Sequence, residues 1–203
     1  MTDDTHGEEP VDPAELAAEL AAEVDGNSST DGDDTPTGAS AEGTATSSGG
    51  VTQSTFVVTH ADDDSAMLRD AATGQVHTLS ENPELDAETV VKATVAPEPP
   101  MGVTDELREV TDKRSVRIEA VGEAPTTQAR RIARDQEPGE VTRQERAGDG
   151  EFHVITVPEG QTEIAVEDVM NDRETRLLQA ARAGASLVEV RSEPGVVSVR
   201  YLP

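Results

Sequence analysis

The sequence predicts an α+β protein: a small antiparallel β-barrel of the OB or SH3-like kind, then a small α+β module, with a disordered acidic tail in front. Three observations predict it. Residues 1–53 are acidic and poor in apolar side chains. Residues 54–122 carry short runs of period two between turn residues. Residues 151–203 read strand–helix–helix–strand–strand, and residues 123–150 connect the two parts through an arginine-bearing helix.

The predicted tail has an unusual charge. Residues 1–55 hold 13 of the 42 acidic residues and no lysine or arginine. Gly, Ser and Thr are dense between 27 and 50, so the segment cannot bury enough apolar surface to offset the entropy of ordering it. Residues 13–25 have the pattern of an acidic amphipathic helix, but their length makes such a helix only transient without a partner.

The barrel is predicted from β-branched and alternating runs bounded by turn residues. We expect strands at residues 55–60, 66–70, 75–79, 89–96, 102–110 and 115–121. Pro97, Pro99 and Pro100 end the fourth run, because proline cannot donate a hydrogen bond to a central ladder. Short antiparallel strands in a span of this length favour a small closed barrel.

The rest of the chain alternates helical and extended patterns. Residues 124–127 open a helix that continues to about Asp135, and a short segment follows around 141–147. Asp172 is placed to cap the second of two later helices, and Gly184 is placed to end it. The expected elements of the last module are a strand at 152–157, helices at 162–170 and after 172, and a hairpin formed by 187–191 and 196–202. We expect its helices to cover one face of a small sheet.

The overall composition indicates a salt-adapted protein. The chain has 42 acidic residues against 16 basic ones, and only Lys92 and Lys113 are lysines. At molar salt the Debye length falls to about 3 Å, so an acidic surface stays hydrated without strong self-repulsion. The chain also has no cysteine, no signal-peptide pattern and no apolar run of membrane-spanning length. We therefore predict a cytoplasmic protein of a halophile that does not contact the membrane.

Arginines concentrate in the connecting region and supply the candidate nucleic-acid-binding residues. These are Arg130, Arg131, Arg134, Arg143 and Arg146. Guanidinium groups bind phosphate through paired hydrogen bonds, so a barrel beside such a patch could bind an RNA or DNA backbone. Two facts weigh against this. The predicted barrel offers only Phe56 for base stacking, and phosphate contacts weaken steeply with salt.

A second cluster has the residue types of a metal site. His60 lies beside Asp62, Asp63 and Asp64, with His77 on a later strand. Three consecutive aspartates between strands are also typical of a solvated hairpin loop, and successive strand residues point to opposite faces. The common catalytic and nucleotide-binding motifs do not occur. We therefore assign no metal ligand, no catalytic residue and no cofactor.

Several stretches of the chain resemble a haloarchaeal domain-of-unknown-function family. They are residues 56–66 (FVVTHADDDSA), 74–79 (GQVHTL), 96–101 (APEPPM), 142–148 (TRQERAG) and 193–203 (EPGVVSVRYLP). The resemblance covers about residues 54–203, and the long acidic tail departs from shorter members that begin near the first strand. It implies a halophilic source and supplies no activity, cofactor or site residue.

Together these patterns favour a non-enzymatic binding or adaptor protein of a halophile's cytosol, with an unidentified protein partner. The first alternative is a nucleic-acid-associated barrel protein that contacts phosphates through the five arginines. The more distant alternative is a metal-dependent hydrolase that uses His60 with Asp62, Asp63 and Asp64.

Overall fold

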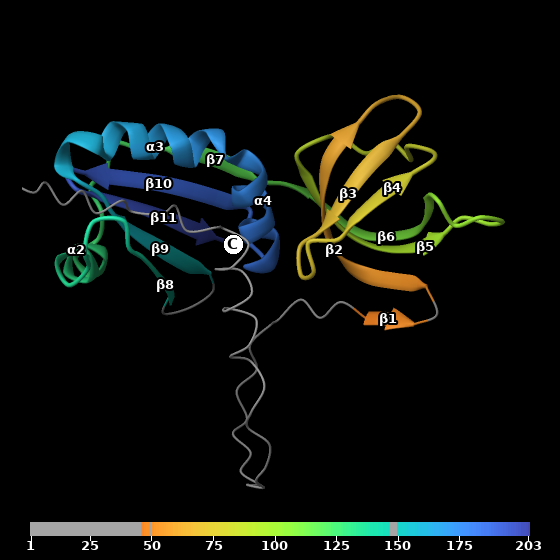
Figure 1. Cartoon of the computed structure of the whole chain (residues 1–203), viewed down its shortest axis with the longest axis horizontal. Helices are drawn as coiled ribbons and strands as arrows, with labels where there is room; N and C mark the ends of the chain where they lie inside the picture. Colours follow the sequence, from red (N-terminus) through yellow and green to blue (C-terminus); the bar gives the residue numbers. More distant parts are fainter. Residues whose placement is uncertain (1–45, 49, 147–149) are drawn as a thin grey trace, which may run out of the picture. The chain divides into compact units, whose positions relative to one another are not determined.

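A computed structural model of the chain describes residues 46–48, 50–146 and 150–203. The predicted acidic tail before residue 46, with its transient helix at 13–25, lies outside the described residues. Two β-sheets and three α-helices make up the described part, so the mixed α+β class predicted from the sequence is confirmed (Figure 1).

The first sheet closes on itself. Its strands are β1 (Thr46–Ser48), β2 (Val51–Ala61), β3 (Ala66–Asp70), β4 (Val76–Leu79), β5 (Thr89–Pro97) and β6 (Asp105–Ser115). The order is β1-β2-β3-β4-β6-β5, and β2 also pairs with β5, so β2 to β6 form a ring of five strands. The ring closes weakly at one seam, where β4 and β6 share a single parallel pair, Leu79 with Asp105.

Both ends of this sheet differ from the prediction. β1 and the start of β2 lie within the stretch expected to be tail, where Thr46 pairs with Gln53 across a tight hairpin. The last expected ring strand, at residues 115–121, is instead β7 (Arg117–Ala120) of the second sheet, with Arg117 beside Leu187 in parallel register. An alternating pattern predicts a strand, but it does not specify a partner that lies far along the chain.

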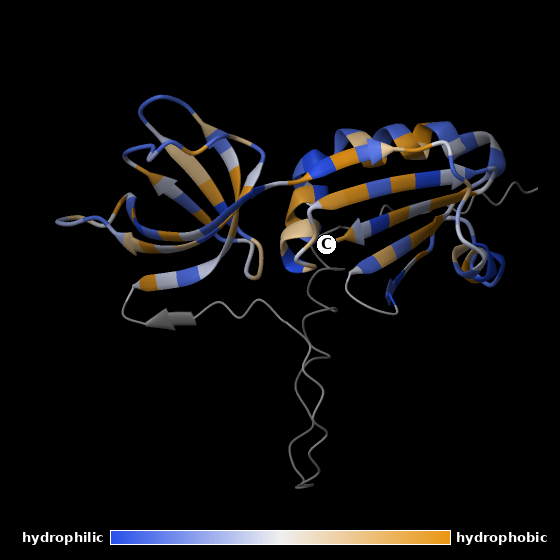
Figure 2. Ribbon diagram, turned by 180° about the vertical axis from the view of Figure 1, so that it is seen from behind, coloured by the Kyte–Doolittle hydropathy of each residue, from blue (hydrophilic) through white to orange (hydrophobic). Residues whose placement is uncertain are grey.

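The interior of the ring follows from the alternation of its strands. Side chains of one parity point inward, and Figure 2 shows the resulting alternation of apolar and polar residues along the strands. The buried interior residues are Phe56, Val58, Ala66, Leu68, Leu79, Leu85, Val91, Ala93 and Val95. Valine and leucine dominate this core, in keeping with a sequence that contains few aromatic residues.

The second sheet has the order β7-β10-β11-β9-β8. Its remaining strands are β8 (Val141–Glu145), β9 (Glu151–Thr156), β10 (Leu187–Glu193) and β11 (Val196–Leu202). β10 and β11 form the predicted hairpin, in which Glu193 pairs with Val196 next to the turn. β8 and β7 lie at the two edges of the sheet.

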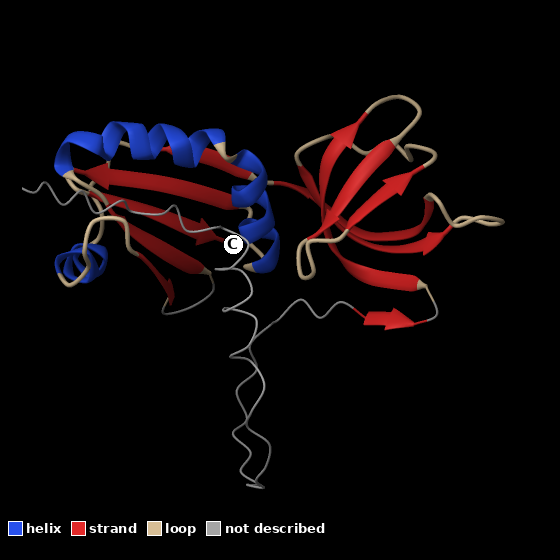
Figure 3. Ribbon diagram, in the orientation of Figure 1, coloured by secondary structure: helices blue, strands red, loops and turns tan. Residues whose placement is uncertain are grey.

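The helices cover both faces of this sheet (Figure 3). After a short 3₁₀ turn, η1 (Glu159–Gln161), helices α3 (Thr162–Asn171) and α4 (Arg173–Arg182) pack on one face. The N-cap of α4 is Asp172, as predicted. Helix α2 (Thr127–Arg134), expected as part of a linker, packs on the opposite face through two buried alanines. The two helices of the last module thus cover one face of the sheet, as expected, and the linker helix α2 adds a cover on the other face.

Helix α4 joins the second sheet to the ring. A single buried cluster includes Val57 and Val90 of the ring together with Leu177 and Ala181 of α4. Ion pairs flank this apolar contact: Arg173 binds both carboxylate oxygens of Glu88 at 2.7 and 2.8 Å, and Arg69 lies 2.6 Å from Glu174. The ring and the second sheet thus share this buried cluster, which is separate from the core inside the ring.

Candidate functional site

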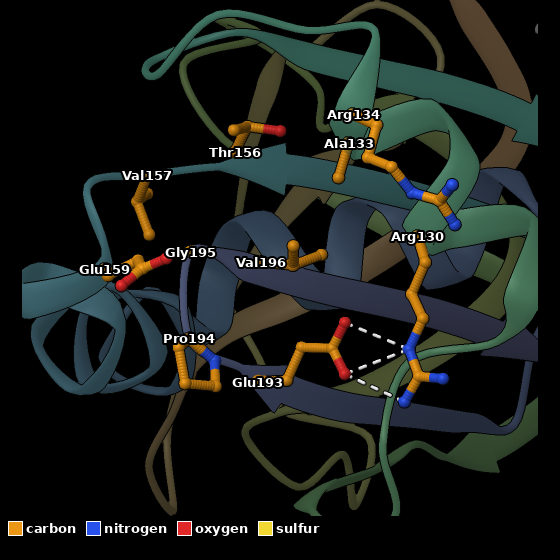
Figure 4. Close-up of a pocket in the computed structure, with 10 residues that line it drawn as sticks. All are labelled: Arg130, Ala133, Arg134, Thr156, Val157, Glu159, Glu193, Pro194, Gly195 and Val196. Carbon is orange, nitrogen blue, oxygen red and sulfur yellow. Dashed lines mark hydrogen bonds and ion pairs between the residues drawn. The ribbon is translucent and has the colours of Figure 1, made fainter.

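A pocket of about 360 Å³ lies where α2, the end of β9 and the β10–β11 turn meet (Figure 4). Its volume is within the range of small-ligand sites. Among its lining residues are Arg130, Arg134, Val157, Glu159, Glu193 and Val196. The pocket therefore combines two of the five predicted arginines with apolar side chains from the turn region.

The local sequence of α2 explains why the arginines lie at the pocket. Thr126 caps the helix by accepting a hydrogen bond from the Ala129 amide at 3.2 Å. Ala129 and Ala133, one turn apart, are buried on the sheet, and their small side chains let the helix approach closely. Arg130 and Arg134 each follow one of these alanines, so both lie on the flank of α2 that borders the pocket.

Arg130 forms a two-point ion pair with Glu193. Its Nε lies 2.9 Å from each carboxylate oxygen, and its Nη2 lies 2.8 Å from Oε2. The two side chains are 40% and 29% exposed, so the pair is partly open to solvent. It connects α2 to the end of β10 and compensates the charge of Arg130.

No carboxylate among the described residues pairs with the positive charge of Arg134. Its side chain is exposed, and its guanidinium makes no hydrogen bond or ion pair with any other residue that the structure describes. Figure 4 shows Arg130 and Arg134 at one end of the pocket and Glu159 at the other end. The pocket is therefore electrostatically polarised, with one uncompensated guanidinium at its basic end.

The β10–β11 turn gives the pocket a fixed wall. Gly195 has a φ of +84°, its amide donates to Thr162 Oγ1 at 2.9 Å, and its carbonyl accepts from the Val157 amide at 3.0 Å. A Cβ at position 195 would lie 3.4 Å from the Val157 carbonyl oxygen. These contacts tie the turn to the end of β9 and to the start of α3.

The five predicted arginines do not form one patch. Arg131 is exposed on α2 and does not line the pocket. Arg143 on β8 pairs across the strands with His153, which points away from the α2 face. Arg146 follows the end of β8 and is half-buried. The structure thus brings Arg130, Arg131 and Arg134 together on α2 and places Arg143 on the opposite face of the sheet.

Arg143 lies instead beside a buried polar cluster under α4. His153 Nε2 is 3.0 Å from Glu151 Oε1, and its ring centroid is 5.0 Å from that of Tyr201. Burial lowers the pKa of His153, and this effect outweighs the opposing hydrogen bond and charge of Glu151. Burial raises the pKa of Tyr201 to about 12. Both rings are therefore uncharged near neutral pH. The cluster forms part of the core beneath α4.

The residues of the metal hypothesis have separate surroundings. Asp62 caps its own turn by accepting hydrogen bonds from the Ser65 and Asp64 amides at 2.7 and 3.0 Å, which lowers its pKa. His60 is exposed at 3.4 Å from Asp62. His77 is buried in the ring, with Nδ1 2.8 Å from Asp105. Within the described ranges, no three such side chains are gathered as metal ligands would be.

Sequence reasoning missed the other wall of the pocket. Glu193 and Gly195 were expected only as the turn of a hairpin, and Val157 only as the end of a strand. The pairing of Glu193 with Arg130 joins positions 63 residues apart, and no local pattern signals it. The one local feature of the sequence that points to this pocket is the arginine-bearing pattern of α2.

Comparison with known proteins identifies the family of the chain. No helix in the described part of the chain is both long enough and apolar enough to cross a bilayer. No curated protein and no solved structure matches the sequence significantly. A family described as a family of unknown function, DUF5812, matches over residues 52–192. The chain therefore belongs to DUF5812.

Proposed function

We propose that this protein is a non-enzymatic binding or adaptor protein, and that its pocket beside α2 takes a carboxylate-bearing, partly apolar group of a protein partner. One observation carries the proposal. At the basic end of the pocket, Glu193 compensates Arg130, whereas the exposed Arg134 has no anionic partner among the described residues. A ligand carboxylate would supply that partner.

The chemistry of the lining supports this ligand class. A guanidinium offers paired N–H donors that match the two oxygens of a carboxylate. Val157, Val196 and Ala133 line the same pocket and would contact a short hydrocarbon stem. A glutamate side chain or the carboxyl end of a peptide chain has this combination of stem and charge.

The lining is also better suited to holding a ligand than to reacting with it. Both carboxylate oxygens of Glu193 are already bound by Arg130, so neither is free to contact a ligand. The Thr156 hydroxyl donates to Gln136 at 3.5 Å and has no imidazole or amine beside it in the lining. These features support binding without catalysis.

A titration with butyrate, a carboxylate with a short apolar stem, tests the proposal. Nuclear magnetic resonance of the full chain should show shifts at Gly195, Val196 and the Arg134 side chain. The variant Arg134→Gln should lose the shifts at Gly195 and Val196, while Arg131→Gln, on the same helix outside the pocket, should keep all three. Shifts that are absent from the pocket, or equal in both variants, would remove the proposal.

Nucleic-acid binding is the second candidate, because Arg131 and Arg134 are both exposed and lie on one helix. A phosphate backbone that tracks along α2 would contact both arginines about equally. Binding of a single-stranded oligouridylate should then fall similarly in Arg131→Gln and Arg134→Gln and should weaken steeply with salt. Oligouridylate binding that is undetectable at low salt would remove this candidate.

We also propose that the ring of β2 to β6 is a small barrel of the OB or SH3-like kind. The closure of the ring through the β2–β5 pairing and its single buried interior support this. In this proposal the barrel is a scaffold that presents loops, and the second sheet with α2 carries the pocket.

We further propose that the protein works in a salt-rich cytoplasm. The support is the excess of 42 acidic over 16 basic residues, with only two lysines. The free energy of unfolding should then rise as KCl increases into the molar range, because salt screens repulsion among the carboxylates. A protein that is equally stable in dilute buffer and in molar KCl would contradict this proposal.

A further inference from the structure

The loop between β5 and β6 presents an apolar tip to solvent. Met101 and Val103 are each 81% exposed, and the adjoining Pro99 and Pro100 are exposed as well. Isolated exposed apolar residues are ordinary on protein surfaces, but neighbouring ones more often mark an interaction site. This tip is the most exposed pair of large apolar side chains in the described part of the chain.

Hydrogen bonds join the two ends of the loop and tie it to Ser80. The Glu98 amide donates to the Thr104 carbonyl, and the Gly102 amide donates to the Glu98 carbonyl, each at 2.8 Å. The Glu98 carboxylate accepts from Ser80 Oγ at 2.6 Å and from Thr104 Oγ1 at 2.8 Å, and these bonds lower its pKa. These bonds restrain the loop before any contact forms, which lowers the entropy that binding through its apolar tip would cost.

The tip is also bordered by negative charge. Glu98, Asp105 and Glu106 flank it, and no lysine or arginine occurs from residue 97 to residue 107. An occupant with apolar side chains and adjacent carboxylates is the class that the pocket beside α2 was proposed to take. The apolar lining and the uncompensated Arg134 of that pocket are complementary to this loop.

We infer that the pocket beside α2 binds the β5–β6 loop, residues 97–105, of a second copy of this chain. The inference rests on the proposed function of the pocket, because it names the partner that the pocket takes. Met101 and Val103 would contact the apolar lining, and the exposed Glu106, which lies 3.8 Å from Arg108 in its own chain, would pair with Arg134. The two surfaces differ, so the contact is heterologous, and a dimer keeps one free pocket on one copy and one free loop on the other.

Salt should affect the two parts of this contact differently. Screening weakens the pairing of a carboxylate with Arg134, while the burial of Met101 and Val103 does not depend on charge. Association should therefore persist in molar KCl and should fall most when the two apolar side chains are replaced.

Sedimentation velocity of the full chain in molar KCl tests this inference with two variants. The first carries Met101→Ser and Val103→Ser in the loop, and the second carries Arg134→Glu in the pocket. All three side chains are exposed, so both variants should fold, and circular dichroism checks this. Wild-type protein should gain average mass as its concentration approaches about 1 mM, where even a weak contact is populated.

The expected pattern in the variants is specific to a loop-into-pocket contact. The loop variant alone should be monomeric, with association weakened about tenfold, or about 1.4 kcal/mol, and Arg134→Glu alone should weaken association by a smaller factor in molar KCl. An equal mixture should recover association, because the intact loop of one variant meets the intact pocket of the other. A wild-type protein that stays monomeric, or a mixture that associates no better than its components, would overturn the inference.

The butyrate titration separates this failure from failure of the pocket itself. Butyrate shifts at Gly195 in a protein that stays monomeric would overturn the second-copy inference and leave the proposed function standing. Loss of both butyrate binding and self-association would remove both. Butyrate that dissociates the wild-type assembly would support both.

Discussion

Arg130 and Glu193 face each other across 63 residues of sequence, joined at both carboxylate oxygens by contacts of 2.8 to 2.9 Å. The pair ties α2 to the end of β10 and leaves Arg134 as the uncompensated cation at the pocket. The arrangement thus determines which arginine is available to a ligand.

Replacing Glu193 by Gln should release the second arginine. The affinity for butyrate should rise about fivefold, or about 1 kcal/mol, since Arg130 then offers its donors to the ligand. The free energy of unfolding should fall by no more than about 1 kcal/mol, because the pair is partly solvent-exposed. Calorimetric titration and urea unfolding measure the two effects. The control Glu163→Gln, an exposed change on α3, should alter neither, and an unchanged butyrate affinity in Glu193→Gln would contradict the prediction.

Alanine variants of two glycines with the same φ distinguish the cost of backbone strain from the cost of a steric clash. Gly139 and Gly150 both have a φ of +98°, but a Cβ at Gly139 would meet nothing within 4 Å, whereas one at Gly150 would lie 2.2 Å from the Tyr201 carbonyl oxygen. Gly139→Ala should cost about 1 kcal/mol of unfolding free energy from strain alone. Gly150→Ala should cost clearly more, because the end of β11 must also shift. Equal losses in urea unfolding would show that the close approach is not important.

Tyr201 should titrate far above an ordinary tyrosine. It is the only tyrosine in the chain, so the ultraviolet absorbance of phenolate reports it alone. Burial raises its pKa to about 12 in the folded protein, against about 10 in the unfolded chain. Because the folded pKa is the higher one, its contribution to stability is complete below pH 10 and is lost as the pH rises toward 12. A folded protein whose tyrosine titrates near 10 would contradict its burial.

The shared buried cluster predicts that the ring and the second sheet unfold together. Leu177 of α4 is 2% exposed in the cluster that also holds Val57 and Val90 of the ring. Leu177→Ala should cost about 2–5 kcal/mol by leaving a cavity. Amide hydrogen exchange should then accelerate in both β2 and β11. The half-buried neighbour Leu178→Ala should cost less, and full protection retained in β2 would show that the ring is independent of α4.

Much of the fold follows from local sequence signals. Thr126 was expected in the turn that opens α2 and is its N-cap, Asp172 caps α4 as predicted, and Gly184 adopts a positive φ just after α4. The predicted hairpin turn at 192–195 joins β10 and β11. These features were predictable because caps and turns depend on residues within a few positions of one another.

The misplaced elements depend on distant partners. Arg117–Ala120 reads as a strand, but its position beside β10 is set by contacts about 70 residues further along the chain. The placement of α2 on the free face of the second sheet depends on Ala129 and Ala133 meeting Phe152 and Val154. Neither relationship is encoded in a short window of sequence.

Only part of the candidate site could be predicted from the sequence, because its remaining residues also depend on distant partners. The arginine-bearing helix drew attention to Arg130 and Arg134, which do line the pocket. The separation of Arg143 from them follows from strand parity, because it pairs with His153 rather than with Phe152. No local pattern in the sequence sets that register.

The most direct test compares the butyrate affinities of Arg134→Gln and Arg131→Gln at one KCl concentration. We predict about a tenfold loss, or about 1.4 kcal/mol, for Arg134→Gln, and a change of less than about twofold for Arg131→Gln. Losses of equal size in the two variants would contradict a pocket that binds through Arg134.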